Sequence, residues 1–177
     1  MDTFDFSKID PSATGKNAVA SVWAEGRAKG RMVVGCATDT IYSVDLGSKR
    51  TSVVTTAHYG DLGSAEQYGE MWALAASSRT DRVLSGAEDK TVRLWGAGAG
   101  ASPNSLLRQN LAVYRGHNYP IWDVDVSHVG FYFASASNDR TSRLWSTDSV
   151  FPLRVFAGHM SDVNVSSTTL KRFFSHS

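Results

Sequence analysis

Short apolar segments separated by polar turn residues follow one another along most of the chain. The pattern is clearest in residues 116–145, where Trp122, Val124 and Val126 alternate with two aspartates. An alternation with a period of two residues is typical of a β-strand that buries one face. This stretch is therefore predicted to begin with a β-strand at residues 122–126.

Two turn signals divide the same stretch into three strands. The first is Ser127–Gly130, and the second is Asn138–Arg140. Asn and Asp favour such turns because they tolerate left-handed backbone and bond their own main chain. The segments 131–136 and 141–145 are therefore predicted as the second and third strands.

The same arrangement recurs at intervals of about 50 residues. The period is visible in three tryptophans 49 and 50 residues apart and in three aspartates 50 residues apart: Trp23, Trp72 and Trp122; Asp39, Asp89 and Asp139. Repeats of this length that hold short strands and no helical period predict a propeller or a solenoid of small antiparallel sheets. We expect the three tryptophans in the core, because they stand within strand segments.

Two of the copies carry a His, a Ser, an Asp and a Trp in the same order. The residues are His58, Ser85, Asp89 and Trp95 in the second copy, and His117, Ser135, Asp139 and Trp145 in the third. These copies resemble WD repeats, the blades of β-propellers, which open with Gly-His and close with Trp. The resemblance implies a hydrogen-bonded tetrad inside each blade, since buried polar groups must find partners.

The first and fourth copies depart from this pattern. In the first copy, Gly35 stands where the serine is expected and Asp45 where the tryptophan is expected, so the network should be incomplete. The fourth copy opens with Gly158-His159, but no turn aspartate and no closing tryptophan follow. Because small propellers need at least about four full blades to close, we expect an open arc.

The predicted fold is all-β, a partial WD-repeat β-propeller of about three and a half four-stranded antiparallel blades. The propeller is expected at 18–164, between a flexible lead-in at 1–17 and a divergent tail at 165–177. Its blades are expected at about 18–45, 52–95 and 111–145, with the start of a fourth at 153–164.

Composition and charge narrow the function classes. The chain has 177 residues, 42% of them hydrophobic and 20% charged, as in a globular domain. A net charge of +1 is too small to hold nucleic acid or an anionic membrane without specific contacts. The single cysteine, Cys36, allows no internal disulfide and fits a reducing compartment, the cytosol or the nucleus.

Residues 114–164 carry features that ordinary WD repeats do not fix, among them Asn118-Tyr119-Pro120 and Phe131-Tyr132-Phe133. With the segment after Trp145, they resemble the WD-repeat TBP-associated factor subunit of TFIID, which SAGA-type complexes share. The resemblance implies a nuclear, non-catalytic scaffold that docks histone-fold TBP-associated factors and supports RNA polymerase II initiation. It implies no cofactor and no small-molecule substrate.

Two other classes of function fit the same residues less well. A WD-repeat adaptor of another complex, such as a ubiquitin-ligase substrate receptor or a ribosome-assembly factor, would use the same blades. Ser135, His117 and Asp139 are also the residue types of a hydrolase triad. The set recurs in the second copy and lacks a nucleophile elbow, so a structural role is favoured. The opening histidines lack zinc-ligand spacing, and no metal site is expected.

Partner contacts are expected beside the tetrads rather than within them. The turn residues that flank each tetrad aspartate, together with one aromatic residue, are the candidates for lining one face of the disc: Glu88, Lys90, Tyr119, Asn138 and Arg140.

Overall fold

The computed structural model describes residues 18–24, 31–36, 40–45, 47–48, 51–56, 58, 70–77, 82–96, 109–127 and 129–163. The expected lead-in (1–17) and tail (165–177) lie outside these residues, as do Asp39 and most of the insertion before Trp72. Every regular element in the described ranges is a β-strand, and these ranges contain no helix long and apolar enough to span a membrane.

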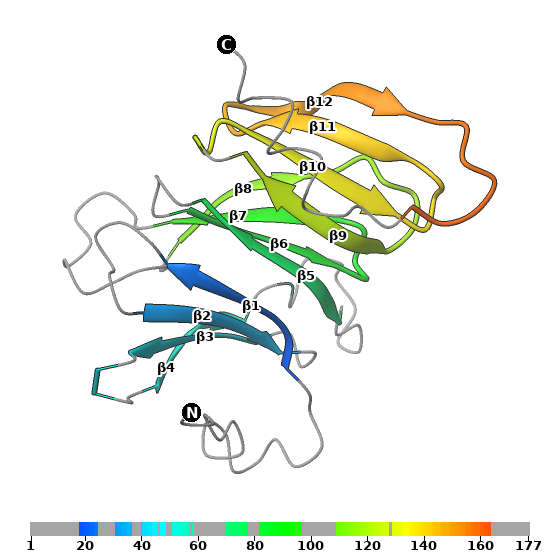
Figure 1. Ribbon diagram of the computed structural model, residues 1–177. Helices are drawn as coiled ribbons and strands as arrows, with labels where there is room; N and C mark the ends of the chain where they lie inside the picture. Colours follow the sequence, from blue (N-terminus) through cyan, green and yellow to red (C-terminus); the bar gives the residue numbers. More distant parts are fainter. Residues whose placement is uncertain are drawn as a thin grey trace.

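Within the described ranges, twelve strands form three four-stranded antiparallel sheets (Figure 1). The first sheet contains β1 (Ala18–Ala24), β2 (Arg31–Cys36), β3 (Thr40–Asp45) and β4 (Thr51–Thr56). The second contains β5 (Met71–Ala76), β6 (Arg82–Ala87), β7 (Val92–Gly96) and β8 (Gln109–Tyr114). The third contains β9 (Ile121–Val126), β10 (Tyr132–Ser137), β11 (Ser142–Ser146) and β12 (Ser149–Phe156).

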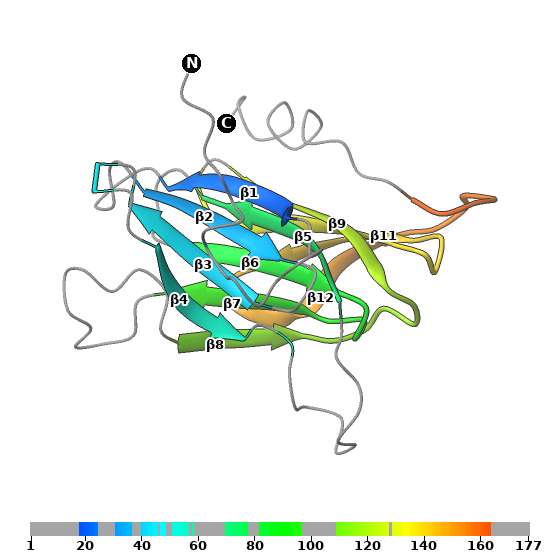
Figure 2. The ribbon, with the colours of Figure 1, turned by 90° about the horizontal axis from the view of Figure 1, so that it is seen from below.

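The sheets stack in chain order, with the inner strands β1, β5 and β9 side by side. Seen from below, the outer strands β4 and β8 lie on the opposite side (Figure 2). The second sheet lies between the first and the third and packs against both. The predicted all-β architecture of antiparallel blades in an open arc is therefore confirmed.

The boundaries between the sheets lie one strand later along the chain than the boundaries between the predicted blades. β4 pairs with β3, β8 pairs with β7 and β12 pairs with β11, so the outer strand completes the preceding sheet. Residues 153–156, expected to start a fourth blade, lie in the outer strand of the third sheet. The Gly-His pair lies where the chain crosses from one sheet to the next. The strand before the pair therefore belongs to the preceding sheet and does not begin a new one.

Two apolar clusters hold the three sheets together. The cluster between the first and second sheets contains Val33, Ile41, Met71, Leu74, Val83 and Trp95. The cluster between the second and third sheets contains Ala73, Ala75, Leu84, Val92, Leu94, Tyr114, Ile121, Val124, Val126, Phe133 and Trp145. Since each pair of sheets buries a continuous apolar layer, the stack is stabilised by repetition of one interface.

Glycine allows close approach at both interfaces. A Cβ on Gly35 would overlap the side chain of Met71, and a Cβ on Gly86 would lie 2.8 Å from Cγ2 of Ile121. Met71 and Ile121 are the first residues of β5 and β9. Gly35 therefore makes room for the next sheet and does not replace a tetrad serine.

The expected equivalence of the three tryptophans is only partly correct. Trp72 and Trp122 each occupy a β-bulge at the second position of an inner strand. In β1 the bulge falls at Val19, whereas Trp23 pairs in register with Met32. Trp72 is 37% exposed, so the prediction of a core position was wrong for it. The prediction assumed the regular alternation of side chains, which the bulge interrupts.

Candidate functional site

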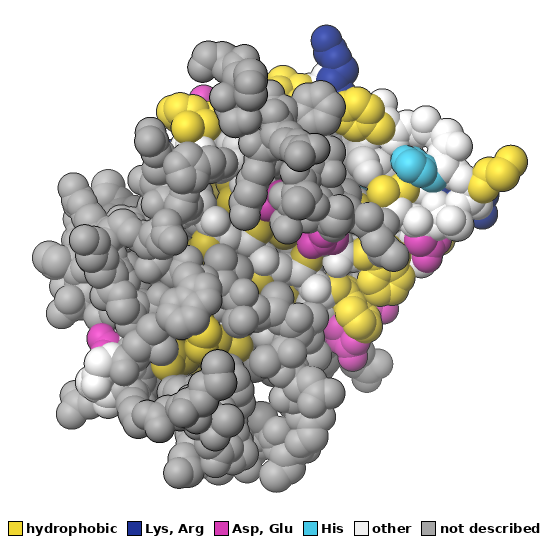
Figure 3. Space-filling view, viewed as in Figure 1, with side chains coloured by type: hydrophobic (Ala, Val, Ile, Leu, Met, Phe, Trp, Pro, Cys, Tyr) yellow, Lys and Arg dark blue, Asp and Glu magenta, His cyan; other side chains and the backbone are white. Residues whose placement is uncertain are grey.

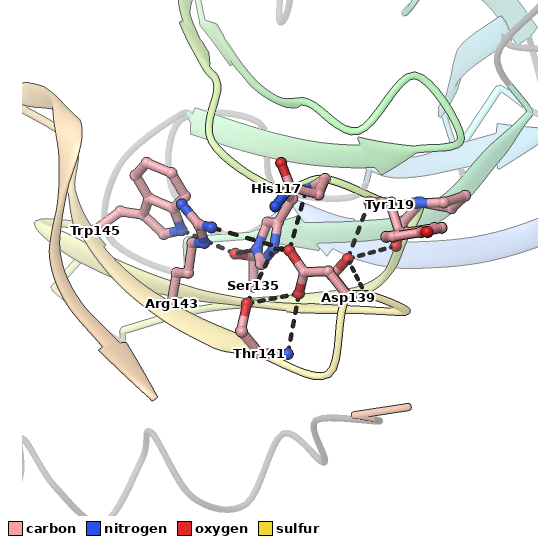
Figure 4. A network of polar contacts seen from close by, with 10 residues as sticks. His117, Tyr119, Ser135, Asp139, Thr141, Arg143 and Trp145 are labelled. Carbon is pink, nitrogen blue, oxygen red and sulfur yellow. Dashed lines mark hydrogen bonds and ion pairs between the residues drawn. The ribbon is translucent and has the colours of Figure 1, made fainter. Parts of the chain in front are cut away.

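The third sheet brings His117, Ser135, Asp139 and Trp145 into one chain of contacts (Figure 4). Nδ1 of His117 lies 2.8 Å from Oδ2 of Asp139, and Nε2 lies 2.7 Å from Oγ of Ser135. The indole Nε1–H of Trp145 donates to the same Oγ at 2.8 Å. The residues come from the connection before β9, from β10, from the β10–β11 turn and from β11, so one network joins four segments.

The direction of each hydrogen bond follows from the donors available. An ionised carboxylate only accepts, so Nδ1 of His117 carries the proton and donates to Asp139. Nε2 is then an acceptor for the hydroxyl of Ser135, whose oxygen accepts from the indole of Trp145. A neutral histidine and a charged aspartate therefore satisfy every group in this chain.

The second sheet repeats the arrangement with nearly the same distances. His58 lies 2.8 Å from Asp89 through Nδ1 and 2.8 Å from Ser85 through Nε2. Trp95 donates to Oγ of Ser85 at 2.9 Å. All eight tetrad residues named from the sequence thus lie in two networks, one in each sheet.

The surroundings keep the aspartates charged and the third-sheet histidine neutral. Burial acts to raise the pKa of Asp139, but hydrogen bonds from Thr141, His117 and Asn118 outweigh it and lower the pKa to about 2. The pKa of Asp89 is lowered against the same burial effect by His58 and Thr91. Burial lowers the pKa of His117 despite its bond to Asp139. Each network is thus built around a carboxylate that stays ionised.

A threonine belongs to each network but was not named from the sequence. The hydroxyl of Thr141 donates to Asp139 at 2.6 Å, and its backbone N–H donates at 2.9 Å. Thr91 makes the same two contacts with Asp89, at 2.8 and 3.0 Å. Both threonines stand two residues after the aspartate, and this shared Asp-x-Thr spacing was a sequence signal for them.

An arginine stands four residues after each aspartate. Nη2 of Arg93 lies 3.4 Å from Oδ2 of Asp89, whereas Nη2 of Arg143 lies 3.9 Å from Oδ2 of Asp139. Gly116 fits against the second arginine, because a Cβ there would lie 2.5 Å from Nη1 of Arg143. With φ of +153°, Gly116 also holds a backbone conformation that other residues rarely adopt.

The first sheet has no such network at the equivalent positions. Its register places Val34 where Ser85 and Ser135 stand, and Val44 where the two tryptophans stand. Both valines are fully buried and form a cluster with Met32. Gly35 and Asp45 were expected at these positions, but each lies one residue further along the chain.

The five candidate partner-contact residues lie on the hairpin turns and the connection before β9. Glu88, Lys90 and Arg140 are exposed, Tyr119 is 56% exposed and Asn138 is half-buried. Lys90 and Arg140 have φ of 68° and 65°, as in a hairpin turn that ends on a left-handed residue.

Tyr119 is tied to the neighbouring turn in the third sheet. The hydroxyl of Ser137 lies 2.9 Å from the backbone oxygens of both Tyr119 and Pro120, and it accepts from the N–H of Asp139. The N–H of Asn138 donates to Pro120 at 3.1 Å. The turn and the segment that carries Tyr119 are therefore held together as one surface.

The networks have hydrolase-like contacts but no access for a substrate. Ser135 and Ser85 are 0% exposed, and each hydroxyl oxygen already accepts an indole N–H. A nucleophilic serine must reach a carbonyl carbon from a free side of its oxygen. The arrangement is therefore suited to holding segments in place. No group of His, Cys, Asp and Glu that could bind a metal occurs in the described part of the chain.

Comparison with known proteins agrees with this architecture. The family model of the WD domain, G-beta repeat, matches residues 61–96 and 108–146. One chain in a crystal structure of the Mitotic Checkpoint Complex superimposes with a TM-score of 0.61 at 15% identity, over 83% of this chain and 39% of that chain. The fold and the repeated tetrads together show that the chain is a WD-repeat protein with a partial β-propeller fold.

Among curated proteins, the chain resembles Transcription initiation factor TFIID subunit 5 of Caenorhabditis elegans. The two are 34% identical over 119 residues, which is 67% of this chain but 16% of that protein. Small ribosomal subunit protein RACK1 of Candida albicans is 37% identical over 68 residues, 38% of this chain and 21% of that protein. The chain thus spans a small part of the relatives it matches.

Proposed function

We propose that the protein is a non-catalytic scaffold subunit of a TFIID-type complex. It would support RNA polymerase II initiation in the nucleus by binding other subunits, the histone-fold TBP-associated factors of TFIID or of SAGA. The observation that carries this proposal is the 34% identity to TFIID subunit 5 over two thirds of the chain. The buried tetrads support the non-catalytic role, since their serines have no free approach.

The turn face is the part of the scaffold that we assign to partner binding. Glu88, Lys90, Asn138 and Arg140 stand on rigid hairpin turns, and Tyr119 is fixed beside the second turn. Residues on loops that a rigid scaffold positions are the usual carriers of recognition. We expect no cofactor, no small-molecule substrate, no membrane contact and no direct contact with nucleic acid.

Recovery of assembled complexes tests the proposal. The tagged chain, expressed in cells, should copurify with histone-fold TBP-associated factors. A double variant, Glu88→Arg with Arg140→Glu, should lose these subunits while keeping the same thermal midpoint. The exposed Phe151→Ala change lies away from the turn face and serves as the matched control. If the double variant copurifies these subunits as well as the wild type does, the turn face does not bind them. If the wild-type sample lacks these subunits, the TFIID role is refuted.

An adaptor of another complex is the second candidate, and the match to RACK1 is the observation that favours it. Sucrose-gradient sedimentation of the same lysate separates the two functions. An adaptor of the ribosome would sediment with the small subunit, whereas a TFIID-type scaffold would not. At physiological salt we expect no binding to a random DNA duplex, because a net charge of +1 releases few counterions.

A further inference from the structure

Among the described residues, the contact between Trp72 and Trp122 includes a ring that is partly exposed to solvent. Trp72 in β5 and Trp122 in β9 meet edge to face, with ring centroids 5.3 Å apart and an interplanar angle of 72°. Both occupy the bulge at the second position of their strand. The bulges lie opposite Ala87 and Ser137, directly before the turns that carry Asp89 and Asp139, so the tryptophan pair belongs to the turn face.

A buried aromatic cluster in the same molecule shows what a purely structural contact looks like. Tyr114, Phe133 and Trp145 also meet through ring contacts, and each is at most 1% exposed. Trp72 in contrast is 37% exposed. Trp122 is half-buried, and its Nε1 is buried without a hydrogen-bond partner within the described part of the chain, so this ring is held mainly by packing against its neighbours. The surface that the pair presents to a ligand is therefore mainly the indole of Trp72, which is supported edge to face by Trp122.

Acidic side chains flank this surface. Glu70 stands two residues before Trp72, and its backbone oxygen accepts from the N–H of Glu88 at 2.9 Å. Both glutamates are exposed. Lys90 and Arg140 are the exposed cations that end the two turns, so these four residues have a formal net charge of zero, and the attraction for a cation comes from the two carboxylates next to β5. Figure 3 shows hydrophobic and acidic side chains side by side where β5 and β9 begin, on the right of the view.

We propose that the Trp72–Trp122 pair is a binding site for a cationic side chain, lysine or arginine, on a partner peptide. An indole face attracts a cation, and nearby carboxylates add to this attraction. The site deepens the turn-face function proposed above and rests on it, since it names the chemistry of the partner. The carboxylates of Glu70 and Glu88 disfavour the phosphates of a nucleic acid, although indoles can also stack on bases.

Small peptides of matched shape test the charge requirement. The probes are Gly-Gly-Xaa-Gly-Gly peptides, acetylated and amidated, in which Xaa is arginine, lysine or the neutral arginine analogue citrulline. Binding is followed by the indole N–H signals of the full chain in two-dimensional NMR. The arginine and lysine peptides should shift the Trp72 signal saturably, with affinities about tenfold above that of the citrulline peptide.

Variants locate the binding on the tryptophan pair. Trp72→Leu should lose the peptide-induced shift of Trp122, and Glu88→Gln should weaken binding about threefold. Phe151→Ala, at a 75% exposed position in β12, should bind as the wild type does. Unchanged indole signals from Trp95 and Trp145 show that each variant has kept its two networks.

Three results would overturn the proposal. Equal affinity for the citrulline and arginine peptides would show that no cation is recognised. Unaltered binding by Trp72→Leu would place the site elsewhere, and tighter binding of a thymidine dodecamer would make this a nucleic-acid surface. Peptide binding without copurified TFIID subunits would refute only the proposed function, whereas copurification without peptide binding would refute only this inference.

Discussion

The first and third sheets fill the same buried positions in opposite ways. In the third sheet Ser135 and Trp145 are joined to His117 and Asp139 by hydrogen bonds. In the first sheet, the equivalent positions hold Val34 and Val44, which pack on Met32. The backbone register is the same, so a WD-type sheet needs these positions filled and free of unsatisfied polar groups, but it does not need them polar.

The hydrogen-bonded network of the third sheet has one consequence that the buried valines of the first sheet lack. His117 lies in the connection before β9, and Asp139 lies in the β10–β11 turn. Their hydrogen bond ties that connection to the turn, and Ser137 ties Tyr119 to the same turn. The network therefore positions the segments that we assign to partner binding, whereas the valines of the first sheet only fill space.

The largest effect is expected from truncating the tryptophan of the network. Trp145 is fully buried in the interface between the second and third sheets. Trp145→Ala should lower the free energy of unfolding by about 3–5 kcal/mol, because it removes apolar contacts and leaves a cavity. The equivalent change in the first sheet, Val44→Ala, should cost about 2 kcal/mol. Urea denaturation measures both, and a smaller loss for Trp145→Ala than for Val44→Ala would contradict the comparison.

Removing the aspartate should have the next largest effect. Asp139→Ala deprives His117, Thr141 and the N–H of Asn118 of their acceptor. Leaving buried donors unpaired should cost about 1–3 kcal/mol. The control is Asp148→Ala at an exposed turn, where a change within about 0.5 kcal/mol is expected. Equal urea midpoints for the two variants would show that the network adds nothing to stability.

A polar side chain at this position in the first sheet, or an apolar one in the third sheet, should destabilise the sheet that carries the change. Val34→Ser places a hydroxyl in the cluster with Met32 and Val44, and should cost about 1–3 kcal/mol. Ser135→Val leaves Nε2 of His117 and Nε1 of Trp145 without their partner, at a similar cost. The thermal midpoint of each variant, compared with that of the wild type, checks both expectations. An unchanged midpoint for Ser135→Val would show that the third sheet tolerates an apolar side chain at this position.

The smallest effect is expected from pH. Because the folded pKa of Asp139 is lowered from 3.8 to about 2 and that of Asp89 is also lowered, their contribution is present above pH 3.8 and is lost as the pH falls through the folded values. His117 acts in the same direction below about pH 6.5, because its folded pKa is lowered. Asp123 acts oppositely, since burial raises its pKa to about 6 and protonation between pH 6 and 4 favours the folded state.

These opposing contributions predict the shape of the stability curve. The thermal midpoint should change little between pH 6 and 4 and fall most steeply between pH 4 and 2. Asp139→Asn should flatten the lower limb, and Asp123→Asn should steepen the loss between pH 6 and 4. A wild-type midpoint that stays constant from pH 4 to 2 would contradict the ionised state assigned to the network.

Local sequence was sufficient for the strands and for the residues of both tetrads. Ser, Asp and Trp recur at the same spacing in the second and third copies, and this spacing follows from one hairpin of fixed length. The alternation of apolar residues likewise predicts strands, because side chains alternate between the two faces of any strand. Thr91 and Thr141 could have been found in the same way, since their distance from the aspartate is also conserved between the two copies.

Tertiary structure alone decided the register of the first sheet, the partners of the outer strands and the exposure of Trp72. Spacing aligned Gly35 with the serines, but the bulge in β1 and the fit of Gly35 against Met71 place Val34 there instead. A shift of one residue moves every side chain to the other face of a sheet. Whether Trp72 is buried depends on which strand packs beside β5, and that contact joins residues far apart in the sequence. Such contacts are set by the packing of whole sheets, which a local pattern of apolar and polar residues does not contain.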